Sequence, residues 1–204
     1  MLPGIAITFK NGNLGQLVES PDGVFGLLAS AVAVDATFVL GKAYQIRSME
    51  DVANLGITAS IDNYMLHKTL SEFYGEAGEG TELWLMGLAK TTKVSDWFTP
   101  DVSGSAPADM LLNAANGKIR MLFTSFSPSA EYVLTVETGL DKDVFLAATK
   151  AQLLADNYTK NKYAPFYTLL EGYGFDGDKV TLKDLTELDL NRVQILIGDT
   201  LSRT

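Results

Sequence analysis

The sequence predicts an α/β fold, in which a mixed sheet is flanked by helices and preceded by an extended N-terminal arm. Strand-like apolar runs alternate with amphipathic helical patterns along most of the 204 residues. Residues 24–34 are almost wholly apolar and small, which is typical of a strand buried on both faces. We therefore expect residues 1–22 to form the arm and residues 23–204 to form one core domain.

The first elements can be assigned in order. Residues 2–23 hold one short alternating run, Ile5, Ile7 and Phe9, among Gly, Asn and Pro, which indicates an arm leading into a domain. After the buried strand at residues 24–34, a second strand is expected at residues 37–46. Ser48-Met49-Glu50-Asp51 has capping-box spacing, so it predicts a short helix that Gly56 ends.

A longer helix and a glycine cluster follow. Residues 60–74 place Ile61, Met65, Leu66, Leu70 and Phe73 on one apolar side, and His67 on the opposite, solvent-facing side. Gly75, Gly78 and Gly80 then precede a strand at residues 82–88. A phosphate loop needs the order strand, glycines, helix, whereas here the order is reversed and three glutamates would repel a phosphate. The glycines therefore indicate a turn from a helix back into the sheet.

The second half continues the alternation. Residues 90–107 indicate a loop with a turn of helix at 94–97, and Pro107 begins a helix that ends at Gly117. Strands are expected at residues 119–125, 131–137, 166–170 and 193–198. A long helix after Asp141 has one apolar face, made of Val144, Ala147, Ala148, Ala151, Leu154, Ala155 and Tyr158. Because no helix follows residue 198, either the last strand is an edge strand or the chain is truncated at its C-terminus.

Composition excludes several classes of protein. The formal net charge of −9 argues against nucleic-acid binding, which needs clustered Lys and Arg. Since the chain has no cysteine, it has no disulfide, thiolate nucleophile or thiolate metal site. No run reaches the roughly 18 apolar residues of a membrane span. We expect no nucleic-acid or membrane partner, and the cytosol is the favoured compartment.

The sequence contains no complete catalytic pattern. Ser125 and Ser127 follow a predicted strand, as a hydrolase nucleophile does, but the chain lacks GxSxG and its single histidine is His67. Asp176, Asp178 and Asp184 do not have calcium-loop spacing, and one histidine without cysteine makes zinc improbable. We therefore expect no catalytic residue, no metal and no cofactor, and a protein that is not an enzyme.

Two further features have competing interpretations. The glycines of residues 171–178 follow a strand, as in a ligand loop, but four acidic residues surround them, so a reverse turn is favoured. Six aromatic residues could line a pocket, although such residues more often belong to a core. These residues are Trp84, Trp97, Phe98, Tyr163, Phe166 and Tyr167.

The order of elements over residues 2–90 resembles the N-terminal half of contractile phage tail sheath proteins. The resemblance rests on the arm Leu2-Pro3-Gly4-Ile5, the strands at 24–34 and 37–46, and Ser48–Asp51 with Leu55-Gly56. It continues through the helix ending Glu72-Phe73-Tyr74, its glycines, and the strand at 82–88. The sequence departs from the family pattern because its glycines are spread out and because the C-terminal domain and arm of sheath proteins are absent from this chain.

This resemblance implies a structural subunit that self-assembles as a homo-oligomer, a ring or helical sheath, around a tail tube protein. It implies a location in a virion tail or phage-like particle assembled in the bacterial cytoplasm. Sheath arms add strands to neighbouring subunits, and here Ile5, Ile7 and Phe9 would select the register. The alternatives are an α/β small-molecule or nucleotide-binding domain, even an enzyme, with its site near Ser125 or Gly172–Gly177, and an adaptor unrelated to phage tails.

Overall fold

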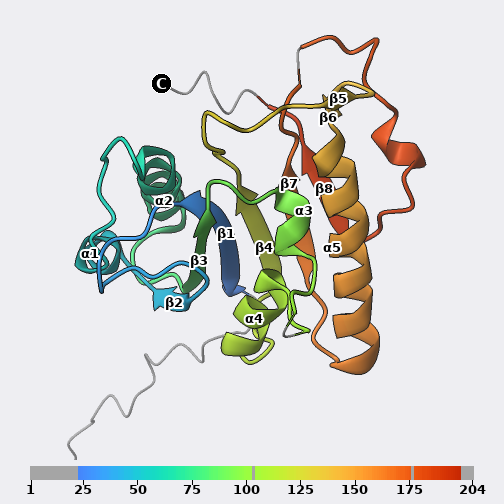
Figure 1. Cartoon of the computed structure of the whole chain (residues 1–204). Coiled ribbons are helices and arrows are strands. Elements are labelled where there is room, and N and C mark those ends of the chain that lie inside the picture. Colours follow the sequence, from blue (N-terminus) through green and yellow to red (C-terminus); the bar gives the residue numbers. More distant parts are fainter. Residues whose placement is uncertain (1–22, 103, 176, 199–204) are drawn as a thin grey trace, which may run out of the picture.

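The computed structural model describes residues 23–102, 104–175 and 177–198. A six-stranded sheet has the order β2-β3-β1-β4-β7-β8, and β5 and β6 form a separate two-stranded ribbon (Figure 1). The strands are β1 (Phe25–Ala31), β2 (Ala43–Ile46), β3 (Leu83–Ala89), β4 (Met121–Ser125), β5 (Val136–Glu137), β6 (Leu140–Asp141), β7 (Tyr167–Glu171) and β8 (Val193–Leu196). The helices are α1 (Met49–Asn54), α2 (Tyr64–Ala77), α3 (Val94–Trp97), α4 (Pro107–Ala114), α5 (Lys142–Asn161) and the 3₁₀ turn η2 (Leu185–Glu187).

The sheet is mixed, as the sequence predicts. β3, β1, β4, β7 and β8 pair in parallel, and β2 pairs with β3 in the antiparallel sense. The central strand β1 is buried along nearly its whole length, because it has a strand on each side and helices on both faces. This arrangement confirms the α/β class and a buried strand within residues 24–34, although the strand ends at Ala31 rather than at residue 34.

Helices lie on both faces of the sheet and divide the core in two. On one face, α1 and α2 pack over β2, β3 and β1, with Val52, Leu66 and Leu70 among the buried side chains. On the other face, α4 packs over β1, β2 and β3, and α5 packs over β7 and β8. Trp97 of α3, Leu111 of α4 and Ala151 of α5 are buried there (Figure 1). α5 lies close to β7 because Ala147, Ala148, Ala151 and Ala155 present little bulk to the sheet.

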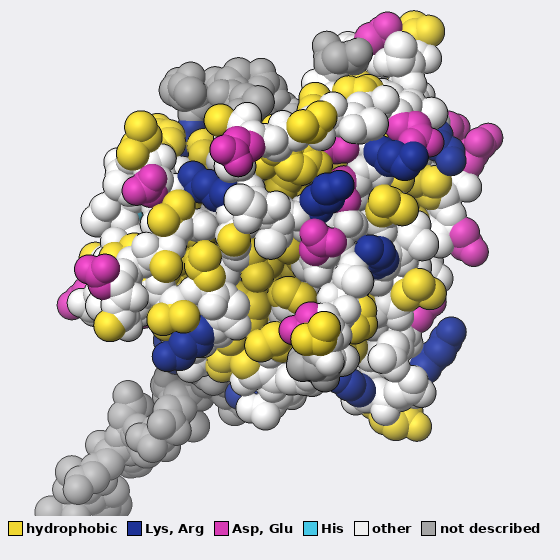
Figure 2. All heavy atoms as spheres, in the orientation of Figure 1, with side chains coloured by type: hydrophobic (Ala, Val, Ile, Leu, Met, Phe, Trp, Pro, Cys, Tyr) yellow, Lys and Arg dark blue, Asp and Glu magenta, His cyan; other side chains and the backbone are white. Residues whose placement is uncertain are grey.

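Figure 2 views the side of the molecule that carries α3, α4 and α5. Acidic and basic side chains are scattered there among hydrophobic ones, and neither sign of charge gathers into one patch. A nucleic-acid-binding face would instead concentrate Lys and Arg, so nothing in this view favours such a face.

Several local predictions are confirmed. Ser48 is the N-cap of α1, and its hydroxyl accepts a hydrogen bond from the Asp51 amide at 3.1 Å. The Asp51 carboxylate accepts in turn from the Arg47 amide at 2.7 Å, so both sides of the cap are satisfied. α3, α4 and α5 begin and end close to the predicted residues. Such caps and periodicities are local, which is why the sequence alone predicts them.

Other predictions need correction at element boundaries. α2 begins at Tyr64 rather than Ser60, and Ile61 is 94% exposed instead of facing the core. Asn63 causes this difference, because its side chain turns inward and bonds both the amide and the carbonyl of Val32 at 2.9 Å. α2 also continues through Gly75 to Ala77, and Gly78, with φ of +81°, caps it. The glycines still return the chain to the sheet, at β3.

Several predicted strands are shorter than expected, and the difference is largest for two of them. A bridge between Val34 and Phe38 closes a turn at residues 35–37, and a second turn lies at residues 40–41, so only Ala43–Ile46 pairs with the sheet. In residues 131–137, only Val136–Glu137 pairs, with β6, and Val133 is 82% exposed. There Tyr132 turns inward instead, where its ring packs on Phe126 and its hydroxyl donates to Asp141. Tertiary contacts of one aromatic residue override the strand propensity of its neighbours.

Asp109 on α4 ties this helix to the C-terminal end of α5. Its Oδ1 accepts a hydrogen bond from the Tyr158 hydroxyl at 2.6 Å and lies 3.0 Å from Lys162 Nζ. Burial by itself would raise the pKa of Asp109. The hydrogen bonds from Tyr158 and Lys162 outweigh this effect, so the pKa lies below its ordinary value.

We expect Asp109→Asn to remove a pH-dependent part of the stability. Because the folded-state pKa is depressed, the carboxylate stabilises the fold fully above the unfolded pKa of about 3.9, and the effect is lost as pH falls through the folded pKa. Denaturant unfolding should show the variant less stable by about 1 kcal/mol at neutral pH. This difference should shrink below about pH 4. Asp62→Asn, at an exposed position, is the control, and a difference independent of pH would contradict the assignment.

Candidate assembly surface

One face of the sheet is only half covered by helices. β1, β2 and β3 lie under α1 and α2, but β4, β7 and β8 extend beyond these helices on the same face. We call the face of these three strands on the α2 side the open sheet half. Strand register brings its side chains into rows, such as Leu27, Phe123 and Leu169 across β1, β4 and β7. The side chains of the open sheet half are Met121, Phe123, Ser125, Tyr167, Leu169, Glu171, Gln194 and Leu196.

Exposure rises across this face with distance from α2. Leu27 on β1 is 3% exposed under Phe73 and its neighbours, whereas Tyr167 on β7 is 53% exposed and Leu196 on β8 is 47% exposed. Phe123 on β4 lies at the margin, partly buried, with its ring stacked 5.8 Å from that of Phe25. The open sheet half is thus a surface of mixed apolar and polar side chains that no helix of the described residues covers.

A hollow of about 520 Å³ lies between α2 and the carboxyl ends of β4, β7 and β8. Its floor is apolar, with Phe123 and Leu169 from the sheet and Phe73 from α2. Lys68, Thr69 and Glu72 form its rim on α2, while Ser125 and Ser127 lie where the chain leaves β4. This hollow occupies the crevice at which the connections after the neighbouring strands β1 and β4 pass to opposite faces of the sheet, a place where α/β proteins commonly bind ligands.

Several polar groups of this hollow are hydrogen-bonded within the protein. Ser125 Oγ lies 3.3 Å from Thr69 Oγ1, and a hydroxyl is not a base that could take its proton. Glu171 Oε2 accepts a hydrogen bond from the Phe126 amide at 2.9 Å, which fixes the chain after β4. His67, predicted to face solvent, is half-buried and does not line the hollow. This geometry does not assemble a serine nucleophile with its histidine.

The glycines after β7 pack the chain closely. The Gly172 amide donates to the Leu196 carbonyl at 2.7 Å, and a Cβ at this position would lie 2.9 Å from that oxygen. Gly174, with φ of +82°, turns the chain beside β6, where the Tyr173 carbonyl accepts from the Asp141 amide at 2.9 Å. These contacts support the reverse turn predicted for residues 171–178 rather than a ligand loop.

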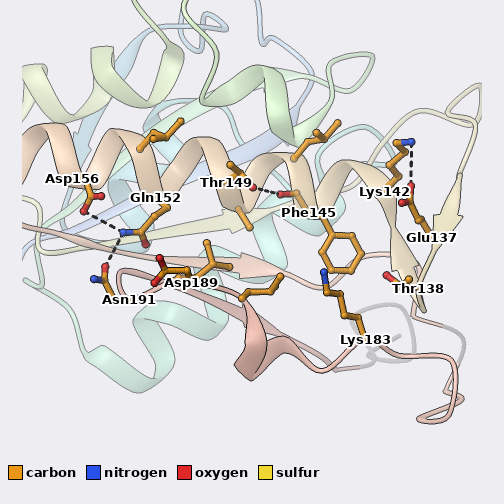
Figure 3. A pocket seen from close by; sticks show the side chains of 15 residues that line it. Glu137, Thr138, Lys142, Phe145, Thr149, Gln152, Asp156, Lys183, Asp189 and Asn191 are labelled. Carbon is orange, nitrogen blue, oxygen red and sulfur yellow. Dashed lines mark hydrogen bonds and ion pairs between the residues drawn. The ribbon is translucent and has the colours of Figure 1, made fainter.

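A second hollow, of about 640 Å³, lies on the other side of the molecule between α5 and the segment 183–191 (Figure 3). Gln152 crosses this hollow: its Nε2 donates to Asp156 and Asn191 at 3.1 and 2.7 Å, and its Oε1 accepts from the Arg192 amide. Lys142 forms an ion pair with Glu137 at one end. The hydrogen bonds of Gln152 anchor the end of the segment 183–191 to α5. The polar groups around Gln152 therefore have a structural role.

The outward side of α5 carries two large apolar side chains. Leu146 is 48% exposed and Leu153 is 65% exposed, and both line the second hollow. They are seven residues apart, which puts them on the same face of the helix about 10 Å apart. An apolar ridge on the outside of a helix is a feature of contact surfaces.

The sheet also has two edges within the described residues. β2 and β8 each pair with one neighbour, so the outer side of each presents unpaired backbone groups. Both are short strands of 4 residues, a common way to limit uncontrolled pairing.

The structure tests some predicted site residues and leaves others aside. Ile5, Ile7 and Phe9 of the predicted arm lie outside the described residues. Of the six aromatic residues, Trp97, Phe98 and Phe166 are buried core and Trp84 is half-buried, whereas Tyr163 and Tyr167 are exposed. Tyr167 belongs to the open sheet half, which sequence reasoning missed. No local signal marks this surface, because Leu169 and Leu196 have the same alternating pattern as the residues of a buried strand.

Within the described ranges, no helix is both long and apolar enough to cross a membrane. The same ranges contain no group of three or more histidine and carboxylate side chains that could hold a metal ion.

Comparison with known proteins gives one family. No curated protein matches the chain. Residues 2–195 match the family described as DUF2586, N-terminal domain. The match includes nearly every residue of the chain and all strands of the main sheet, except the last residue of β8. The chain therefore belongs to the DUF2586 family, as its N-terminal domain.

Proposed function

We propose that this protein is a structural subunit of a contractile phage-tail-like sheath, which self-assembles around a tail tube. The observation that carries the proposal is the open sheet half. Exposed apolar side chains on this surface, such as Tyr167 and Leu196, are costly to leave in water, and an uncovered patch of them is a mark of a protein–protein interface. The two sheet edges add backbone groups with which an arm of a neighbouring subunit could pair.

The proposal is also supported by the order of elements. The arm, the buried strand, the capped short helix, the longer helix and the return to the sheet follow the sheath pattern, and the described part has β1, α1, α2 and β3 in that order. In this proposal the subunit acts by contact geometry and has no catalytic centre.

Deletion of residues 1–19 is expected to abolish higher-order assembly and to leave the fold intact, because the described sheet is complete without them. Negative-stain electron microscopy across a concentration series should show rings or striated tubes for the full-length chain and discrete particles for the deletion. Circular dichroism and the melting temperature provide the control for folding.

Assembly that survives the deletion would remove the arm from the mechanism. Discrete particles from the full-length chain at every concentration would overturn the sheath proposal itself.

A second function, small-molecule binding, is favoured by one specific observation. The 520 Å³ hollow lies at the carboxyl ends of β4, β7 and β8 in the crevice beside β1, where open α/β sheets bind their ligands. Its apolar floor and hydroxyl-bearing rim suit an amphipathic molecule. A thermal-shift screen with nucleotides and amphipathic acids tests this function, and a ligand whose effect is lost in Ser125→Ala would support it.

A further inference from the structure

The segment between β7 and β8 is attached near both ends of the second hollow. At one end, the Lys183 amide donates to the Thr138 carbonyl at 3.0 Å, in the turn between β5 and β6. At the other, Gln152 of α5 bonds the Asn191 side chain and the Arg192 amide. Between these two attachments the segment leaves the hollow of about 640 Å³ beside α5 (Figure 3). We call this hollow the α5 groove.

The α5 groove is long rather than round. α5 lines it from Lys142 to Asp156, which are about 21 Å apart along the helix axis. Leu146 and Leu153, which are 48% and 65% exposed, form its outer margin on the solvent side of the helix. A groove of this length with an exposed margin admits an extended chain, whereas a small molecule would fill only part of it.

The middle of the α5 groove is apolar, and its two ends carry opposite charges. Half-buried apolar side chains line the middle, namely Phe145, Leu188 and Leu190. Figure 3 shows Lys183 turned toward the Phe145 end of the groove and Asp189 toward the Gln152 end. Phe145 and Gln152 are about 10 Å apart along the helix axis, so the two charges have a similar separation.

The charges of Lys183 and Asp189 are available to a ligand. Neither side chain forms a hydrogen bond or an ion pair with another of the residues that the structure describes. The charges next to them are occupied, because Lys142 is paired with Glu137 and Asp156 accepts a hydrogen bond from Gln152. The wall formed by the segment 183–191 therefore presents one unpaired cation and one unpaired anion, with apolar side chains between them.

We propose that the α5 groove binds an extended segment of a different protein, with an acidic side chain beside Lys183 and a basic side chain beside Asp189. Because both charges belong to one wall, the two ligand side chains must point to the same side of their chain. Alternate residues of an extended chain share a side, and residues i and i+4 are about 13 Å apart. The flexible stems of the charged side chains accommodate the difference from 10 Å. Residues i+1 and i+3 then face α5, where apolar side chains meet Phe145.

The first experiment uses a synthetic pentapeptide with both ends blocked and the sequence Glu-Leu-Val-Leu-Lys. Titrated into the isotope-labelled full chain, it should shift the backbone amide NMR signals of residues 142–156 and 183–191 and approach saturation below about 1 mM. The uncharged peptide Gln-Leu-Val-Leu-Gln should bind at least about fourfold more weakly, because it lacks both ion pairs. The absence of saturable shifts up to about 1 mM, or shifts confined to the 520 Å³ hollow, would overturn the proposal.

Double-mutant cycles assign the two charge contacts. Lys183→Gln should weaken binding of Glu-Leu-Val-Leu-Lys about two- to fivefold and leave binding of Gln-Leu-Val-Leu-Lys unchanged. Asp189→Asn should have the same effect, measured against Glu-Leu-Val-Leu-Gln. Lys179→Gln, at an exposed position outside the groove, is the matched control and should bind every peptide like the wild type. Equal losses with the charged and the uncharged peptides would show that these side chains do not meet the ligand's charges, and would overturn the proposal.

Two further measurements distinguish other occupants. Aminoundecanoic acid has a carboxylate and an ammonium group at opposite ends of an apolar chain. If it binds as tightly as the pentapeptide and depends equally on Lys183, the groove is a small-molecule site and the proposal is wrong. Shifts of the same amides that grow with the concentration of the protein alone would make a second copy the occupant and overturn the proposal as well.

This inference goes beyond the proposed function and does not depend on it. α5 and the open sheet half lie on opposite faces of the sheet. Failure of peptide binding would leave the sheath proposal standing, and a chain that never forms rings or tubes would leave the α5 groove to be judged by the peptide titrations.

Discussion

Gly87→Ala is expected to lower the free energy of unfolding by about 2–3 kcal/mol, the cost of overpacking a filled core. Gly87 lies in β3 between β1 and β2, and its carbonyl accepts from the Gly41 amide at 2.8 Å. A Cβ at this position would lie 2.4 Å from Cζ of Phe38. The Phe38 ring is fully buried and packs 5.5 Å from Tyr44, so it has no space into which to move. The melting temperature should fall by roughly 5–10 °C.

Gly75→Ala is the matched control, and we expect it to have the opposite sign. Gly75 lies inside α2, and nothing lies within 4 Å of a Cβ built there. Because alanine loses less backbone entropy than glycine in a helix, the variant should gain roughly 0.5–1 kcal/mol. Equal effects of the two substitutions would contradict the contact between Phe38 and β3.

Phe126→Ala is expected to cost about 3–5 kcal/mol, among the largest effects of a single truncation. Phe126 follows β4 and is 5% exposed. Its ring contacts Trp97, Tyr132 and Tyr173 edge to face, with centroids 5.9, 5.2 and 5.0 Å away. Removal of this ring leaves a cavity among three aromatic residues that come from different segments. Denaturant unfolding, followed by tryptophan fluorescence, measures the loss.

Phe123→Ala, on the same strand, is the control for this second prediction. Phe123 faces the open sheet half and is only partly buried, so its truncation should cost about 1–2 kcal/mol. It should instead weaken association between chains more than Phe126→Ala does, when the two folded variants are compared by sedimentation. A reversed order of stability losses would show that the open sheet half is the better packed face.

Part of this architecture could be read from the amino-acid sequence. The cap at Ser48, the proline that begins α4 and the alanine-rich face of α5 depend on residues close in sequence, and all lie as predicted. The start of α2 and residues 131–135 were predicted wrongly because Asn63 and Tyr132 form contacts with Val32 and with the Phe126 cluster, respectively. Local patterns cannot contain such partners.

The candidate site was predicted less completely than the fold. The structure places Thr69 beside Ser125 and gives the glycines after β7 the predicted turn, and the absence of a catalytic residue stays a prediction. The arm residues Ile5, Ile7 and Phe9 remain a prediction. The open sheet half was missed because Tyr167, Leu169 and Leu196 look like the side chains of any buried strand.

The sequence by itself determined the order of the helices and most of the strands, and which side of α5 is buried. These properties follow from the spacing of apolar residues, because a helix or strand turns its side chains with a fixed period. Only the tertiary structure decided the strand order, the place of β8 at an edge, and which face of β4, β7 and β8 lacks a helix. Alternation gives a strand two faces, but the direction in which each connection crosses the sheet decides which face is covered.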